Sequence, residues 1–199
     1  MIRPASVRRL RVWAALGSVL LAAAAVSAEQ QILAVGWTGY APRLGALRGA
    51  AGLRVEERPA TGWSISFDQP LRRWPALWLG VCARHYAASV RGPGYDLRTV
   101  ALRPRIGAFL DVFQHIFYGA VEAGAQRLSQ SGGANGDAYS WTAALSLGYQ
   151  WEFARRRTLG LRWFAEAGTE LAGRPRIDAT RFDLGDGLRG RFGLAVQLD

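Results

Sequence analysis

The feature that most constrains the fold is a fifteen-residue stretch, Tyr139 to Phe153, in which apolar residues alternate with small or polar ones. Side chains on a β-strand alternate between its two faces, so this stretch predicts a strand with one apolar face. Most strands in soluble proteins have only about five or six residues. A long strand with aromatic residues at both ends of its apolar face is typical of a lipid-crossing strand of a β-barrel. The expected aromatic girdle, which includes one residue from the next strand, is Tyr139, Trp141, Tyr149, Trp151, Phe153 and Trp163.

Residues 1–28 have the three parts of a secretory signal peptide. Four Arg residues precede an uncharged apolar run from Val12 to Val26, and Val26-Ser27-Ala28 offers small residues for cleavage. The alternative is a membrane anchor, but a spanning helix needs about 20 apolar residues. We therefore expect cleavage after Ala28, which leaves 171 of the 199 residues.

The composition of the chain after Ala28 excludes several classes of function. Its 21 basic residues are all Arg and stand against 15 acidic residues, a formal charge of +6 without a long basic block. No nucleic-acid partner is therefore expected. With two His residues and the single Cys82, no metal site of His and Cys ligands is expected, and no cofactor motif stands in the right context.

Alternation recurs along the chain and predicts an all-β fold, an eight-stranded antiparallel transmembrane barrel over residues 46–199. Three short connections, 69–75, 111–115 and 154–157, would share one end, and three longer ones, 89–94, 129–137 and 172–187, the other. This is the expected asymmetry between short periplasmic turns and longer outer loops, and the short predicted connection 57–60 is the exception. Residues 29–45 form either a lead-in or an alternative first strand in place of 46–56. The eight predicted strands are 46–56, 61–69, 76–88, 95–110, 116–128, 138–153, 158–171 and 187–198.

The face of these strands that would line the barrel carries many charges of both signs. Eight strands leave an interior just wide enough for side chains, and an unpaired buried charge is costly. We therefore expect Arg–carboxylate pairs that plug the lumen, since a guanidinium can meet a carboxylate through two hydrogen bonds. The core of this predicted network is Arg103, Arg105, Glu122, Glu152, Arg162, Glu166, Arg189 and Arg191.

By this pattern of strands the chain resembles small bacterial outer-membrane β-barrels of the OmpA or OmpX size class. The resemblance implies a location in the outer membrane, contact with its lipid and lipopolysaccharide, and recognition by the barrel-assembly machinery during biogenesis. We expect a monomer with a non-enzymatic structural or surface-interaction role. Six arginines are expected at the outer rim, where they are either solvated surface charges, which the sequence favours, or contacts for lipopolysaccharide phosphates: Arg91, Arg98, Arg127, Arg174, Arg176 and Arg181.

The alternative function is a lipid A-modifying hydrolase. A third hypothesis, a soluble periplasmic β-barrel with a lipophilic ligand in its lumen, is disfavoured by the polar inward face of the strands. The chain is similar in size to barrels that deacylate lipid A, which use a His and a Ser two residues apart. Here Ser89 lies four residues after His85, and no Ser lies two residues after His115. His85 and Ser89 remain a weaker candidate for a catalytic pair, but the sequence favours a role without catalysis.

Overall fold

The computed structural model describes residues 30–42, 60–90, 95–131, 136–177, 180–181 and 187–198. The predicted signal peptide at 1–28 and the predicted strand at 46–56 lie outside the described residues. Within the described part of the chain, no helix is long and apolar enough to cross a membrane.

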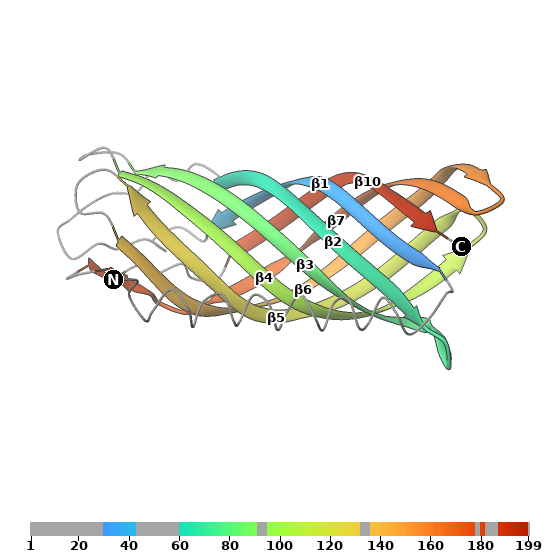
Figure 1. Ribbon diagram of the computed structural model, residues 1–199, viewed down its shortest axis with the longest axis horizontal. Helices are drawn as coiled ribbons and strands as arrows, with labels where there is room; N and C mark the ends of the chain where they lie inside the picture. Colours follow the sequence, from blue (N-terminus) through green and yellow to red (C-terminus); the bar gives the residue numbers. More distant parts are fainter. Residues whose placement is uncertain are drawn as a thin grey trace, which may run out of the picture.

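Eight long antiparallel strands close into a barrel, which confirms the predicted fold class (Figure 1). Around the barrel the order is β1, β10, β7, β6, β5, β4, β3 and β2, and β2 returns to pair with β1. A separate two-stranded sheet joins β8 (Arg176–Ile177) to β9 (Thr180–Arg181). The barrel strands are β1 (Gln31–Pro42), β2 (Ala60–Leu71), β3 (Trp74–Val90), β4 (Tyr95–Val112), β5 (His115–Ser131), β6 (Gly136–Arg156), β7 (Leu159–Ala172) and β10 (Gly187–Leu198).

The first strand of the barrel is β1, which corresponds to the alternative first strand predicted within 29–45, so the predicted barrel range of 46–199 is corrected to begin at Gln31. β1 closes the ring because both of its edges are paired: Gln31 faces Leu198 on β10, and Ile32 faces Asp68 on β2. The prediction sought polar residues on the inner face of each strand. The inner face of β1 instead carries small residues such as Ala34, which packs against Phe164 and Ala195 inside the barrel.

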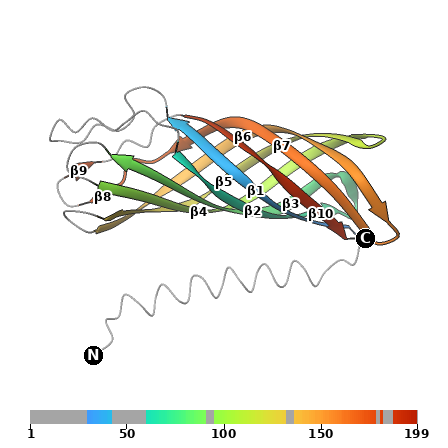
Figure 2. The ribbon, with the colours of Figure 1, turned by 90° about the horizontal axis from the view of Figure 1, so that it is seen from above.

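The two ends of the barrel differ in their connections (Figure 2). Two-residue turns at 72–73, 113–114 and 157–158 lie at one end, where Gln31 and Leu198 also pair. The longer connections lie at the other end, as predicted. Following the usual asymmetry, we call the end with the short turns the periplasmic end and the other the outer end.

The strands are strongly staggered around the ring. A row of facing residues leaves β6 at Tyr149 and crosses β7, β10, β1, β2, β3, β4 and β5 before it returns to β6 at Tyr139, ten residues from its start. Such a stagger accompanies the tilt of strands in a closed barrel. Because of this stagger, residues at very different positions along their strands lie at the same height along the barrel axis.

The outer wall of the barrel is apolar. Exposed large side chains follow one face of every barrel strand, among them Leu33 on β1, Ile106 on β4 and Leu147 on β6, which is 73% exposed. The buried charged side chains, among them Arg84 and Glu122, lie on the opposite face. This inside-out arrangement is that of a lipid-embedded barrel.

Candidate functional site: the lumen network

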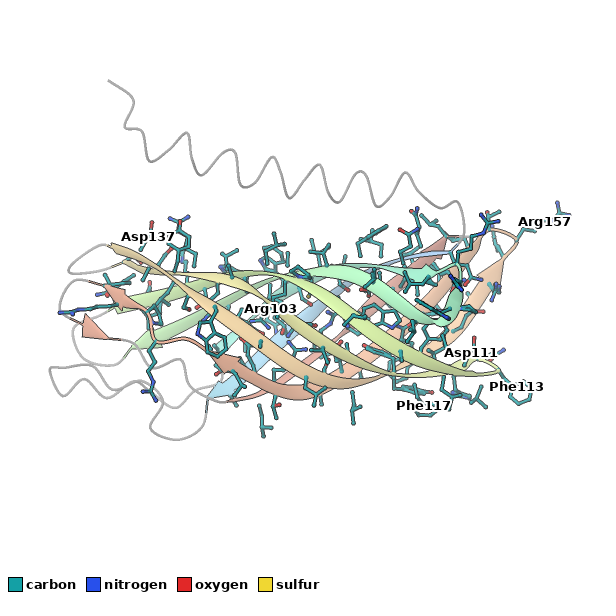
Figure 3. All side chains as sticks on the ribbon, turned by 90° about the horizontal axis from the view of Figure 1, so that it is seen from below. Arg103, Asp111, Phe113, Phe117, Asp137 and Arg157 are labelled. Atoms are coloured by element: carbon teal, nitrogen blue, oxygen red, sulfur yellow. The ribbon has the colours of Figure 1, made fainter. Side chains whose placement is uncertain are left out.

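Nine charged side chains from six strands meet in the middle of the barrel. Each is at most 7% exposed, and Arg103 can be seen inside the ring of strands in Figure 3. We call this set the lumen network. Its members are Asp68 of β2, Arg84 of β3, Arg103 and Arg105 of β4, Glu122 of β5, Glu166 and Glu170 of β7, and Arg189 and Arg191 of β10.

Glu122 links β5 to strands on both sides of the lumen. Its Oε1 accepts a hydrogen bond from Nη2 of Arg84 at 2.9 Å, and its Oε2 accepts one from Nη1 of Arg189 at 2.8 Å. Arg103 lies near the same carboxylate, at 3.7 Å. Charge-assisted bonds of this length are the strong class of hydrogen bond.

Glu166 is the second centre. It accepts hydrogen bonds from Arg84 at 3.2 Å, from Arg105 at 3.1 Å and from Arg189 at 3.1 Å. The hydroxyl of Tyr118 donates a fourth hydrogen bond to this carboxylate at 3.0 Å. A buried carboxylate can accept about four hydrogen bonds, so Glu166 is fully engaged.

Glu170 forms the third centre with Arg103. The guanidinium meets both carboxylate oxygens, through Nη1 at 2.8 Å and through Nη2 in a second, shorter contact. Thr142 donates a further hydrogen bond to Oε1 of Glu170 at 3.3 Å. This two-pronged geometry is the one that favours Arg over Lys.

Most of the short contacts cross the lumen, although the bond between Arg189 and Glu166 joins the neighbouring strands β10 and β7. Arg105 faces Glu122 on the neighbouring strand, but their closest charged atoms are 3.7 Å apart. The corresponding distance between the neighbours Arg191 and Glu166 is 3.9 Å. The shorter bonds instead join β3 with β7, β4 with β7, and β5 with β10, strands that are three or four places apart in the ring. The network therefore braces the cross-section of the barrel.

Five Arg residues stand against four carboxylates in the lumen network, and aromatic rings and a thiol contact the remaining guanidinium surface. Arg105 lies over the ring of Trp78 and Arg191 over the ring of Phe164, each at 4.6 Å. Such cation–π contacts gain strength when the cation is shielded from water. The Sγ atom of Cys82 accepts hydrogen bonds from Arg84 and Arg191, both at 3.3 Å.

The predicted network residues fall into two groups. Arg103, Arg105, Glu122, Glu166, Arg189 and Arg191 meet in the lumen network. Glu152 and Arg162 form a separate pair near the periplasmic end, with Nη2 of Arg162 at 3.1 Å from Oε2 of Glu152. Asp68, Arg84 and Glu170 also face inward by sequence parity, but nothing in the sequence marks them as members of the core.

Two glycines make room for aromatic residues that contact the network. A Cβ on Gly148 would lie 2.1 Å from the ring of Tyr118, and one on Gly107 would lie 2.2 Å from the ring of Trp78. Glycine inside a strand commonly marks such a close approach. In the sequence, only the alternating pattern, which places Tyr118 and Trp78 on the inward face, indicates that these rings lie in the lumen.

The predicted girdle residues gather near the two ends of β6. Tyr139 and Trp141 are exposed toward the outer end. Toward the periplasmic end, Trp163 packs against Tyr149 and Trp151, with ring centroids 5.3 Å and 6.2 Å apart. Phe117 and His115 extend this cluster through contacts with Tyr149. Figure 3 shows Phe117 on the outside of the barrel, close to the short turn at Phe113.

His85, the weaker catalytic candidate, lies on the outer face of β3. Its ring stacks on that of Trp63, with centroids 5.7 Å apart. The side chain of Ser89 lies outside the described residues. In the described part of the chain, no cluster of three or more His, Cys, Asp or Glu is arranged to hold a metal ion.

Known structures share this fold at low sequence identity. No protein-family model and no curated protein sequence matches the chain. Neisserial surface protein A is 14% identical, with a TM-score of 0.56 over 85% of this chain and 96% of its own. Ail of Yersinia pestis, solved with the heparin analogue sucrose octasulfate, is 9% identical, with a TM-score of 0.51 over 85% of this chain and 98% of its own. The outer membrane protein OprG of Pseudomonas aeruginosa is 8% identical, with a TM-score of 0.51 over 85% and 95%.

These likenesses confirm the resemblance to small outer-membrane barrels. The chain is an outer-membrane-type β-barrel, and its apolar outer wall agrees with the predicted location in the outer membrane.

Proposed function

We propose that this protein is a non-enzymatic outer-membrane barrel whose lumen is closed by the lumen network and whose outer rim binds phosphorylated glycolipid. The observation that carries the first part is the set of buried Arg–carboxylate bonds that span the lumen between opposing strands. An eight-stranded barrel has room for little besides such side chains. We therefore expect the protein to act through its outer surface and not through an open channel.

Two arginines on the outer face support the second part. Arg98 and Arg127 are exposed on neighbouring strands, and Arg127 lies beside Tyr139 of the outer girdle. Lipid A phosphates lie at this level of the membrane, and Arg is well suited to phosphate. Arg174 and Arg176 are exposed just beyond β7, whereas Arg91 and the side chain of Arg181 lie outside the described residues. The complex of Ail with a sulfated sugar supports an anionic saccharide as the class of partner.

Arg127 also forms an ion pair with Asp137, at 2.6 Å. A phosphate would compete with that carboxylate for Arg127. Substitutions of the two residues should therefore change glycolipid binding in opposite directions. Loss of Arg127 should weaken glycolipid binding, and loss of Asp137 should strengthen it.

The test measures binding of the purified protein to bis-phosphorylated lipid A in mixed micelles. We expect Arg98→Gln with Arg127→Gln to weaken binding several-fold, and Asp137→Asn to strengthen it. Arg157→Gln, at the periplasmic end, is the matched control and should change nothing. Equal binding to dephosphorylated lipid A would contradict the proposal.

Two further measurements address the closed lumen and the absence of catalysis. In planar bilayers we expect no large steady conductance, because the network fills the lumen. The mass spectrum of lipid A from cells that make the protein should match that from cells without it. A large conductance would exclude the closed lumen, and a loss of acyl chains that depends on His85 would favour the hydrolase.

A further inference from the structure

A second feature lies at the opposite end of the barrel from the outer rim. A recess enters the lumen there, with about 590 Å³ of empty space when the open solvent at its mouth is included, and we call it the periplasmic vestibule. It lies at the periplasmic mouth, because Pro70, Asp111 and Gln197, which line it, stand at the strand ends next to the short turns and the barrel termini. The lining residues used below are Asp68, Trp78, Phe109, Asp111, Tyr118 and Arg162.

The lumen network forms the floor of the vestibule. Tyr118 lines the recess and hydrogen-bonds Glu166, and Asp68 lines it within 3.5 Å of Nε of Arg105. A molecule that enters from the periplasm would reach these two side chains at the inner end of the recess. The vestibule is therefore open at the periplasmic mouth and closed at its inner end by the lumen network.

One wall of the vestibule is aromatic. Trp78 and Tyr118 pack edge to face with centroids 6.3 Å apart, and Phe109 packs against the same cluster. Aromatic walls bind apolar groups, and their ring faces also attract organic cations. This wall suits the body of a small amphipathic molecule.

The carboxylate of Asp68 lines the same recess as this aromatic wall. Asp68 is 7% exposed, and its Oδ1 atom accepts no hydrogen bond from any described residue. Its ionic neighbour, Nε of Arg105, also forms no hydrogen bond, and the same guanidinium is bonded to Glu166. Since buried carboxylates are stable only when donors reach them, Asp68 is a ready acceptor for a ligand N–H group.

The basic residues of the vestibule are already engaged. Arg162 donates to Glu152 through Nε and Nη2, and to Gln150 through Nη1. Arg155 lies 3.5 Å from Glu152. A ligand carboxylate would therefore have to compete with Glu152 for these arginines, while Asp111 adds a second negative charge at the exposed mouth.

We propose that the periplasmic vestibule binds a small organic ammonium ion with an aromatic or aliphatic body. The ammonium group bonds to Asp68, and the body packs on Trp78, Phe109 and Tyr118. Asp111 attracts the cation at the entrance. This proposal is independent of glycolipid binding at the outer rim.

The test uses isothermal titration calorimetry on the protein purified in detergent micelles, with three phenylalkyl probes of similar size. These are 2-phenylethylammonium, the neutral 2-phenylethanol and the anionic 3-phenylpropanoate. We expect the ammonium ion to bind at least ten-fold more tightly than the alcohol, and the carboxylate not to bind. Equal heats from all three probes would mean partition into the micelle and would overturn the proposal, as would a failure of the ammonium ion to bind.

Variants then assign the site. Asp68→Asn should weaken ammonium binding at least ten-fold, and Asp137→Asn, at the far end of the barrel, should leave it unchanged. Heat-modifiable gel migration shows whether Asp68→Asn still forms the barrel. Independently, Asp111→Asn at the exposed mouth should weaken binding several-fold, and Gln150→Trp should abolish it by filling the recess. Unaltered binding in these last two variants, or in a folded Asp68→Asn protein, would overturn the proposal.

Discussion

At the scale of single residues, Glu166 holds the lumen network together. It is contacted by three guanidinium groups and by Tyr118, and its side chain is fully shielded from solvent. Burying charges costs free energy, so the network is stable only while each charge retains its partners. The effect of removing one carboxylate should therefore depend on how many buried cations it leaves behind.

We predict that Glu166→Gln lowers the free energy of unfolding by about 3–5 kcal/mol, the usual cost of breaking a buried ion pair. Glu152→Gln is the matched control. It removes the same charge from a less buried site at the periplasmic end, where the exposed Arg155 is one of its two partners, and should cost less. Urea unfolding of both variants in the same vesicles provides the measurement. Equal losses would mean that the lumen network carries no special share of the stability.

At the scale of elements, the turn between β4 and β5 combines two unusual properties. Phe113 has a φ of 61°, and it is 96% exposed. Among the described residues only Gln30 and Phe113 have a positive φ without being glycine. A two-residue turn with a positive φ at its first central residue alone is the pattern of a type II′ turn, which favours Gly there.

We predict that Phe113→Gly raises the stability of the barrel by about 1 kcal/mol, because glycine adopts a positive φ without steric strain. Gln114→Gly, one residue later, should lower stability by about 0.5–1 kcal/mol, because it only adds freedom to the unfolded chain. Melting temperatures in detergent micelles compare the two. A lower melting temperature for Phe113→Gly would show that the exposed ring forms a stabilising contact with lipid or detergent.

Elements also show how far the sequence alone can go. Alternation predicted 138–153 as a strand, and the structure extends it only to Gly136–Arg156. The same rule preferred 46–56 over the segment of β1 as the first strand, because Ala34 and Gly36 are small where polar residues were expected. Parity likewise identified which charges face the lumen. It could not pair Arg103 with Glu170 or Arg84 with Glu122, because those contacts depend on the ten-residue stagger and on which strands lie opposite each other.

At the scale of the whole molecule, the barrel is organised from the inside outward. Its charges are buried at the centre, and an apolar band surrounds them. Leu147 lies near the middle of β6 and is 73% exposed, whereas Leu188 is 66% exposed at the outer end of β10. In water such a surface would promote aggregation, but in a bilayer these two positions differ only in depth.

This depth dependence gives a prediction for the whole barrel in lipid. Leu147→Arg should lower the free energy of unfolding in vesicles by about 2–4 kcal/mol, the cost of a cation near the bilayer midplane. The same change at Leu188 should cost about 0–1 kcal/mol, because its side chain reaches the interface. Reversible denaturant titrations monitored by tryptophan fluorescence compare the two variants. If both substitutions cost the same, the band is not embedded at the proposed depth. If neither costs anything, the apolar wall does not face lipid, and the outer-membrane assignment fails with it.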